Sequence, residues 1–162
     1  MTINKKIVTL NRLIRIVEKL KKQGKKIVTT NGVFDILHLG HVKYLEQAKR
    51  LGDVLIVGVN SDSSVRHIKG DKRPINNKKS RIGVIAGLES VDFAFLFNEK
   101  DPRKWIGKIK PDAHVKAGDY EIGKIIERDV VEKNGGKIII AKVLKGYSTT
   151  GLIDKILTLY NQ

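Results

Sequence analysis

The chain has 162 residues, of which 41% are hydrophobic, and this length and composition predict one folded domain with a buried core. Because it contains no cysteine, a disulfide framework and a thiolate zinc site are excluded. With 32 basic against 17 acidic residues, its net charge of +15 favours anionic partners such as nucleotides, sugar phosphates or nucleic acid.

The distribution of apolar and basic residues further limits the possible kinds of partner. No signal-peptide pattern follows the N-terminal lysines, and no stretch approaches the roughly 20 apolar residues of a membrane span, so we expect a cytoplasmic protein without a membrane partner. The lysines are scattered along predicted helices with few aromatic residues, so no platform for stacking single-stranded bases is predicted. A basic nucleic-acid-binding module is the less favoured alternative, and it would bind with a steep salt dependence.

Helices and strands alternate along the predicted chain. Residues 1–25 form an N-terminal helical extension, in which apolar residues recur at helical spacing until Gly24. Apolar stretches are predicted strands at 26–30, 54–59, 91–96, 111–116 and 137–141. Helices are predicted at 42–51, 63–68, 78–88, from Asp101-Pro102, at 125–134 and after Thr150. This order predicts an α/β fold with a doubly wound, Rossmann-like parallel sheet of about five strands and right-handed crossovers.

The stretch Thr30-Asn31-Gly32-Val33-Phe34-Asp35-Ile36-Leu37-His38-Leu39-Gly40-His41 joins the first predicted strand to a helix. Ligands of open α/β sheets bind at such a strand end, and a helix N-terminus offers free N–H groups to phosphates. His38 and His41 fall on one face of the first turn, and Gly40 has no side chain to hold a phosphate away. The pattern predicts a phosphate site with two imidazole donors. The alternative is a strand–turn–helix in which both histidines only cap.

Polar residues also follow the second predicted strand. Ser61 or Asp62 is suited to cap the helix that follows. The loop Lys69-Gly70-Asp71-Lys72-Arg73-Pro74-Ile75 is rich in turn formers and basic residues. Arginine suits a bidentate contact with phosphate and lysine a point-charge contact. From the residues alone, an exposed basic loop is the simpler interpretation of this segment.

Two later segments also carry charged or hydroxyl side chains that could contact a ligand. Lys116 and Asp119 come at the end of the fourth predicted strand, where they either face a ligand or pair with each other. Ser148 or Thr149 can cap the last helix and can also donate to a phosphate. His114 lies within a strand, and we expect it in the core rather than in catalysis.

The first motif resembles the Gly-x-Phe-Asp-x-x-His-x-Gly-His signature of the cytidylyltransferase-like nucleotidyltransferases. The full motif is most similar to that of the D-glycero-β-D-manno-heptose 1-phosphate adenylyltransferases. Two further segments are similar to motifs of the same enzymes: Lys-Gly-x-x-Arg-Pro-Ile at 69–75 and Gly-x-Ser-Thr-Thr at 146–150. The similarity runs from about Lys26 to Ile156. It implies a single nucleotidyltransferase domain of the His-x-Gly-His type over 1–162. It also implies that a sugar 1-phosphate attacks the α-phosphorus of ATP, giving ADP-heptose and pyrophosphate.

The same resemblance implies roles for individual residues. Catalysis is expected from His38, His41 and Lys43. The nucleotide is expected to contact Thr30, Asn31, Gly32, Val33, Phe34, Gly40, Lys116, Gly118, Asp119, Tyr147, Ser148 and Thr149. The sugar phosphate is expected to contact Asp35, Asn60, Asp62, Lys69, Arg73 and Arg81. The chain departs from the family pattern at Ala117, where glycine is usual and alanine would be strained if a positive φ were required.

The resemblance also implies partners. Mg²⁺ is expected to arrive with ATP and to keep mostly water ligands, without metal ligands from the protein. A separate sugar kinase would act upstream, and a homodimer is usual in the superfamily. A glycerol-3-phosphate cytidylyltransferase and an FMN adenylyltransferase are the alternatives, because base choice rests on main-chain contacts that residue identities do not reveal. The anomer of the sugar phosphate stays open as well.

Overall fold

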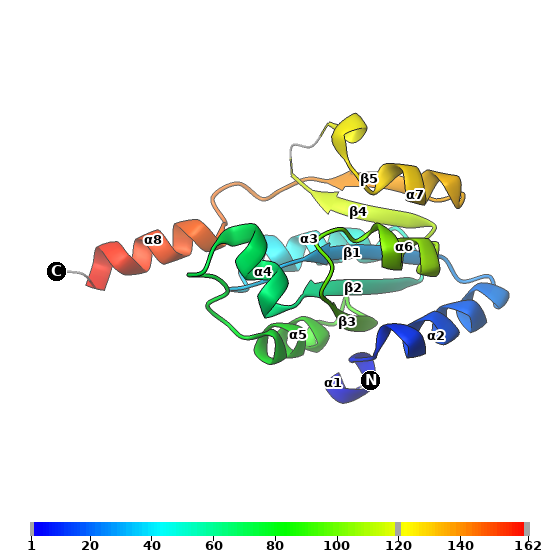
Figure 1. Cartoon of the computed structure of the whole chain (residues 1–162), viewed down its shortest axis with the longest axis horizontal. Coiled ribbons are helices and arrows are strands. Elements are labelled where there is room, and N and C mark those ends of the chain that lie inside the picture. Colours follow the sequence, from blue (N-terminus) through cyan, green and yellow to red (C-terminus); the bar gives the residue numbers. More distant parts are fainter. Residues whose placement is uncertain (1, 119–120, 161–162) are drawn as a thin grey trace.

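The computed structural model describes residues 2–118 and 121–160, and its centre is a parallel sheet with strand order β3-β2-β1-β4-β5 (Figure 1). The strands are β1 (Ile27–Gly32), β2 (Val54–Asn60), β3 (Phe93–Phe97), β4 (Ala113–Ala117) and β5 (Lys137–Ala141). Each predicted strand is present, and all pairs are parallel. The predicted doubly wound α/β fold is therefore confirmed.

The helices connect these strands. They are α1 (Ile3–Lys6), α2 (Leu10–Lys22), α3 (Leu39–Lys49), α4 (Asp62–Lys69), α5 (Lys78–Gly87), α6 (Arg103–Ile109), α7 (Arg128–Lys133) and α8 (Thr149–Tyr160), with a 3-10 turn at Ile122–Lys124. Helix α3 starts at Leu39, three residues earlier than predicted, because His38 has extended backbone angles (φ −140°, ψ 168°) and is the N-cap. Helix α7 starts at Arg128, three residues later than the predicted start at 125. None of the helices in the described part of the chain has the length and apolar composition that a bilayer crossing requires.

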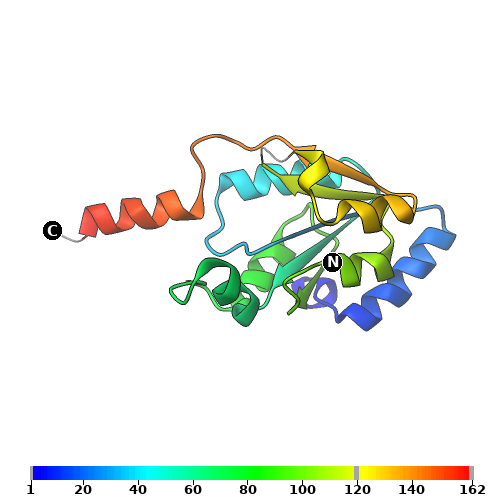
Figure 2. The same cartoon turned by 45° about the horizontal axis from the view of Figure 1, so that its top comes forward.

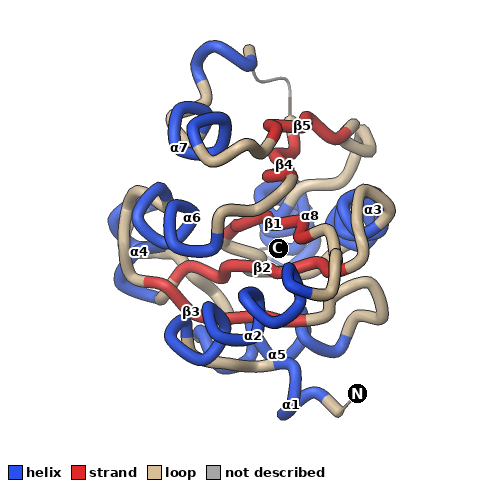
Figure 3. The backbone as a smooth tube through the Cα atoms, turned by 90° about the vertical axis from the view of Figure 1, so that its right-hand side faces the viewer, coloured by secondary structure: helices blue, strands red, loops and turns tan. Residues whose placement is uncertain are grey.

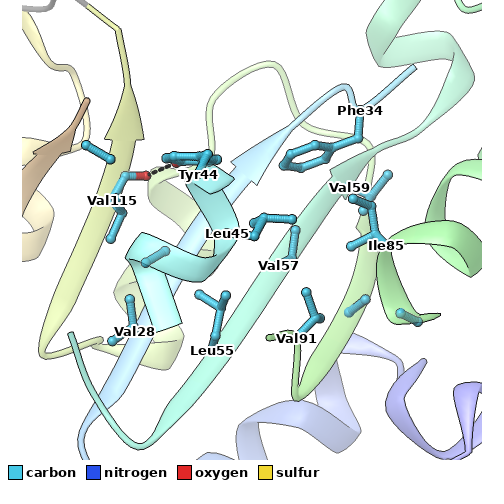
Figure 4. Packing of buried hydrophobic residues seen from close by; sticks show 14 of the residues in the cluster. Val28, Phe34, Tyr44, Leu45, Leu55, Val57, Val59, Ile85, Val91 and Val115 are labelled. Atoms are coloured by element: carbon cyan, nitrogen blue, oxygen red, sulfur yellow. Dashed lines mark hydrogen bonds between the residues drawn. The ribbon is translucent and has the colours of Figure 1, made fainter. Parts of the chain in front are cut away.

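Helices cover both faces of the sheet (Figure 3). On one face, α3 and α5 pack through residues such as Leu45 and Ile85 onto Val57 and its neighbours (Figure 4). On the other face, α2, α6 and α7 bury a second apolar cluster that includes Leu13 and Trp105. Coverage on both sides explains why every residue of β2 is buried and why its sequence is a nearly unbroken apolar run. Helix α2 of the predicted N-terminal extension thus packs against the sheet.

His114 lies in the interior, as predicted. Its side chain is fully buried, and Nδ1 is 2.8 Å from the hydroxyl oxygen of Thr29 on the neighbouring strand. Burial, with a smaller effect from Lys116, lowers the pKa of His114 to about 3. The imidazole is therefore neutral at physiological pH and serves as part of the core.

The strand order places a crevice above β1 and β4. The chain runs from β1 to β2 and β3 on one side of the sheet and then returns to add β4 and β5 on the other. Connections leave the carboxyl ends of β1 and β4 in opposite directions, and ligands of doubly wound sheets bind at such a switch point. Helix α8 begins beyond this edge and projects away from the sheet (Figures 1 and 2).

Gly136, between α7 and β5, is closely packed, so we expect a larger residue at this position to destabilise the fold. A Cβ at this position would lie 2.2 Å from the carbonyl oxygen of Pro111, so backbone must shift to admit one. We expect Gly136→Ala to lower the free energy of unfolding by about 1–3 kcal/mol, the usual cost of overpacking, as measured by urea denaturation.

Gly83→Ala is the matched control. A Cβ at Gly83 would meet nothing within 4 Å, and the residue lies inside α5. Because alanine is favoured over glycine in a helix by about 1 kcal/mol, this variant should be as stable as the parent or more so. Equal stability of the two variants would contradict the packing described for Gly136.

Candidate active site

The carboxyl edge of the sheet holds a cavity of about 630 Å³ between the ends of β1 and β4. Its walls come from the loop after β1, the start of α3, the ends of α4 and β4, and the segment that leads into α8. Segments far apart in the sequence therefore meet at the edge where the fold predicts a ligand. Most of the predicted site residues line it: Asn31, Gly32, Val33, Phe34, Asp35, His38, Gly40, His41, Asn60, Lys69, Arg73, Lys116, Tyr147, Ser148 and Thr149.

The two histidines lie face to face at the N-terminus of α3. Their ring centroids are 3.8 Å apart and the planes differ by 18°. The edge of the Phe34 ring supports His41, with centroids 5.4 Å apart. Phe34 itself has a φ of 48°, in the left-handed region that non-glycine residues seldom adopt. The loop thus holds an uncommon backbone conformation that places an aromatic ring behind His41.

Both imidazoles are uncharged at neutral pH. Burial lowers the pKa of His38, and burial together with the neighbouring His38 lowers the pKa of His41 to about 4. The Nδ1 atoms of both rings and Oδ1 of Asn31 are buried and have no hydrogen-bond partner within 2–118 and 121–160. Since buried polar groups are almost always paired, three such atoms beside one cavity mark a place for a polar ligand.

The crowding around this pair favours glycine at position 40. A Cβ on Gly40 would lie 3.0 Å from Nδ1 of His38 and 3.1 Å from Cβ of Tyr147. Any side chain would press on both residues, in addition to covering the backbone of the first helical turn. The prediction that Gly40 leaves this turn open is consistent with the structure.

The segment before α8 closes the cavity from the other end of the sequence. The hydroxyl of Thr149 donates to the carbonyl oxygen of Ile36 at 3.4 Å, which joins the start of α8 to the loop after β1. Ser148 Oγ accepts the N–H of Gly151 at 2.9 Å and so caps the helix. The N-termini of α3 and α8 therefore border the same cavity, and helix N-termini favour anions.

Lys116 enters the cavity from the end of β4, held by an acid that the sequence analysis missed. Its Nζ lies 2.6 Å from Oε1 of Glu127, whose side chain is 4% exposed. Asp119, the predicted alternative partner, lies outside the described residues. Glu127 gave no signal in the sequence, because an irregular segment separates it from Lys116 and no periodicity relates the two.

The backbone near Lys116 shows whether alanine is strained at position 117, where glycine is usual in the family. Among residues other than glycine in the described chain, only Phe34 and Lys110 have a positive φ, and the left-handed position after β4 belongs to Gly118, with a φ of 131°. Alanine at 117 therefore carries no backbone strain. Gly118 itself does not line the cavity.

Four further predicted residues have side chains engaged elsewhere. Lys43 is exposed and pairs with Glu46 at 3.0 Å. Thr30 is buried and bonds through its hydroxyl to Tyr44, which also donates to the carbonyl oxygen of Val115 at 2.8 Å. Tyr44 lines the cavity and was not predicted.

Arg81 and Asp62 form the other engaged pair. The Arg81 side chain is fully buried, and its Nη2 lies 2.8 Å from Oδ1 of Asp62. It also donates to the carbonyl oxygens of Val33, Asn60 and Asn76. Arg81 thus braces three loops beneath the cavity, a role that its position on a helix did not reveal.

Comparison with known proteins gives one matching family model and many relatives. The cytidylyltransferase-like model matches residues 29–154. A curated relative, the bifunctional protein HldE of Geobacter metallireducens, is 47% identical over 157 residues, which are 97% of this chain and 32% of that protein. HldE of Actinobacillus succinogenes is 50% identical over 150 residues, 93% of this chain and 32% of that protein. The chain thus spans about a third of the length of these curated relatives.

Solved structures agree with this assignment. A lipopolysaccharide core biosynthesis protein from Thermoplasma volcanium is 35% identical with a TM-score of 0.62, covering 77% of this chain and 100% of that one. A pantoate-beta-alanine ligase from Francisella tularensis has a TM-score of 0.63 at 20% identity, covering 96% and 79%, and shares the fold. Because the family model matches most of the sequence and its motif residues meet in one cavity, the chain belongs to the cytidylyltransferase-like family of nucleotidyltransferases.

Proposed function

We propose that the protein transfers AMP from ATP to D-glycero-β-D-manno-heptose 1-phosphate, giving ADP-heptose and pyrophosphate. The observation that carries this proposal is the stacked pair His38 and His41, which shares a cavity with Ser148 and Thr149 from the far end of the sequence. The bifunctional HldE relatives and the lipopolysaccharide core biosynthesis protein support the choice of a heptose 1-phosphate within the family.

The proposed step is an in-line displacement at phosphorus. An oxygen of the sugar phosphate forms a bond to the α-phosphorus of ATP. The bond between that phosphorus and the α,β-bridging oxygen breaks, and pyrophosphate leaves with the electron pair. The attacking oxygen is already anionic, so no general base is required. Catalysis then rests on positioning and on hydrogen bonds to the charge that develops. Neutral His38 and His41 each keep one N–H to donate to the phosphate oxygens.

The two substrates would occupy different ends of the cavity. The nucleotide phosphates would lie against the N-termini of α3 and α8, beside the histidines and Ser148. The sugar phosphate would meet the cationic side of the cavity, formed by Lys69 and Arg73. We assign no substrate contact to Lys43, Asp62 or Arg81, because their side chains do not line the cavity.

Mg²⁺ would be carried on the triphosphate. Within the described ranges, no three His, Asp or Glu side chains are grouped as a metal site. The carboxylate of Asp35, which lines the cavity, already accepts three hydrogen bonds from the protein. The donors around the cavity therefore suit an ion that binds mainly to phosphate and water.

Partners follow from the chemistry of the reaction. A sugar kinase would supply the sugar 1-phosphate, and both steps would take place in the cytoplasm, where ATP is made available. We also propose that the chain forms a homodimer, since α8 exposes Ile156, Leu157, Leu159 and Tyr160. Light scattering in solution would test the dimer.

Pyrophosphate release tests the proposed function. The protein is incubated with ATP or CTP and with heptose 1-phosphate, glycerol 3-phosphate or FMN. We expect release with ATP and heptose 1-phosphate, together with a nucleotide-sugar product. Turnover only with CTP and glycerol 3-phosphate would indicate a glycerol-3-phosphate cytidylyltransferase instead. Turnover only with ATP and FMN would indicate an FMN adenylyltransferase.

His41→Ala should lower kcat by about 10²–10³, the cost of removing one preorganised donor. His67→Ala is the control, because His67 is an exposed histidine on α4 that does not line the cavity. Both variants should retain the far-UV circular dichroism of the parent. Near-normal turnover of His41→Ala would contradict the proposed role of the histidine pair.

The low pKa of His41 also predicts how stability changes with pH. The value of about 4 in the folded protein lies below the ordinary value of 6.5, so between these two pH values the unfolded chain binds a proton that the folded chain does not. The free energy of unfolding should therefore fall as the pH falls from 6.5 to 4, by up to roughly 1.4 kcal/mol per pH unit for this group.

Urea denaturation at pH 7 and pH 5 measures this slope. His41→Gln removes the titrating group and should lose less stability between the two pH values than the parent does. The His67→Ala variant should follow the parent. An unchanged slope in His41→Gln would show that His41 does not titrate with a depressed pKa.

A further inference from the structure

The loop between α4 and α5 carries Arg73 to the cavity wall. The loop turns sharply at Gly70–Arg73, where the N–H of Arg73 donates to the carbonyl oxygen of Gly70 at 3.1 Å. The side chain of Arg73 is 16% exposed, and that of its partner Asp35 is fully buried. Asp35 belongs to the loop after β1, so this pair joins the histidine-bearing loop to the basic loop.

Asp35 binds the basic loop through both carboxylate oxygens. Oδ2 accepts from Nε of Arg73 at 2.6 Å and from the N–H of Ile75 at 2.9 Å. Oδ1 accepts the N–H of Asn76 at 2.8 Å, and the Asn76 side chain donates back to the carbonyl oxygen of Asp35 at 2.7 Å. These bonds fix the position of the loop relative to the first motif.

The pairing occupies only one edge of the guanidinium. Asp35 accepts from Nε, and neither Nη atom of Arg73 has a hydrogen-bond partner in the parts of the chain that the structure describes. A guanidinium has five N–H donors in one plane, and a phosphate accepts two of them together. Arg73 is thus anchored through Nε, and it lines the cavity that contains the histidines.

The carboxylate is charged under working conditions. Burial opposes ionisation of Asp35, but the hydrogen bonds from Asn76, Ile75 and Arg73 outweigh it and hold the pKa below the ordinary value. A carboxylate is a poor ligand for an anion because its charge repels the phosphate, and Asp35 already accepts three donors from the protein. Its contacts suit support of Arg73 better than contact with the substrate.

We propose that Asp35 is a positioning residue for the acceptor: it holds Nε of Arg73 so that the Nη atoms face the phosphate of the sugar 1-phosphate. This inference rests on the proposed function, because it assigns the cationic end of the cavity to the acceptor. It predicts that loss of Asp35 impairs binding of the sugar phosphate and leaves binding of ATP unchanged.

A double-mutant cycle tests the inference. Asp35→Asn and Arg73→Gln should each raise KM for the sugar 1-phosphate by about 10- to 100-fold, the range for a lost hydrogen bond to a charged group, with KM for ATP within about twofold of the parent. The double variant should be impaired much less than the product of the two single effects, since Asp35 acts on the sugar phosphate through Arg73. Multiplicative effects of the two changes would mean that Asp35 acts independently of Arg73 and would overturn the proposal.

Two further variants separate positioning from folding. Asp101→Asn removes an exposed aspartate that pairs with Nε of Arg103 at 2.6 Å, outside the cavity, and should leave both KM values unchanged. Asp35→Glu keeps the charge but moves it by one methylene group, so it should fold and still raise KM for the sugar phosphate. A parent-like KM for that sugar phosphate in Asp35→Glu would overturn the proposal.

Calorimetric binding distinguishes this inference from the proposed function. Heptose 1-phosphate is titrated into the full chain with a non-hydrolysable ATP analogue present. If the parent binds the sugar phosphate but forms no nucleotide-sugar, the proposed function fails while Asp35→Asn should still weaken binding. Unchanged affinity in that variant, or no binding of sugar phosphate to the parent, would overturn the inference about Asp35.

Discussion

The contact between His38 and His41 constrains much of the structure around it. Two imidazoles stacked 3.8 Å apart disfavour charge on both rings at once, and burial lowers the pKa of each. An extended His38 before the helix, Gly40 beside the His38 ring and the ring of Phe34 against His41 accompany the stack. The unfavourable φ of Phe34 is tolerated because that ring is buried in the core beside α3 and α5.

Buried charge in this protein is concentrated beneath the cavity. Asp35, Arg81 and Glu127 are each nearly inaccessible to solvent, and each pairs with an opposite charge near the carboxyl edge of the sheet. A buried ion pair contributes little net stability, so its value lies more in fixing geometry. The surface lysines that give the chain its positive charge contribute a general attraction for anions, whereas these pairs set the directions of individual donors.

The fold and the first motif were predictable because their signals are local. A continuous apolar run such as β2 predicts a covered strand. The spacing of His38 and His41 predicted neighbouring rings, although His38 is the N-cap of α3 and only His41 lies in its first turn. Helix ends were less accurate, since the N-cap depends on the backbone angles of a single residue. The partners of Lys116 and Arg73 were not predictable, because no periodicity relates Lys116 on β4 to Glu127 at the start of α7, or Arg73 to Asp35 in another loop. Arg81 was expected at the ligand, and its buried side chain pairs with Asp62 and does not line the cavity.

The fate of isotopically labelled oxygen tests the central claim, that the histidine pair serves a displacement at the α-phosphorus of ATP. Heptose 1-phosphate labelled with ¹⁸O in its phosphate is incubated with ATP, and the products are separated and analysed by mass spectrometry. The account predicts that the label is retained in ADP-heptose and absent from pyrophosphate. Label in a product of γ-phosphate transfer, or formation of ADP without a nucleotide-sugar, would contradict it.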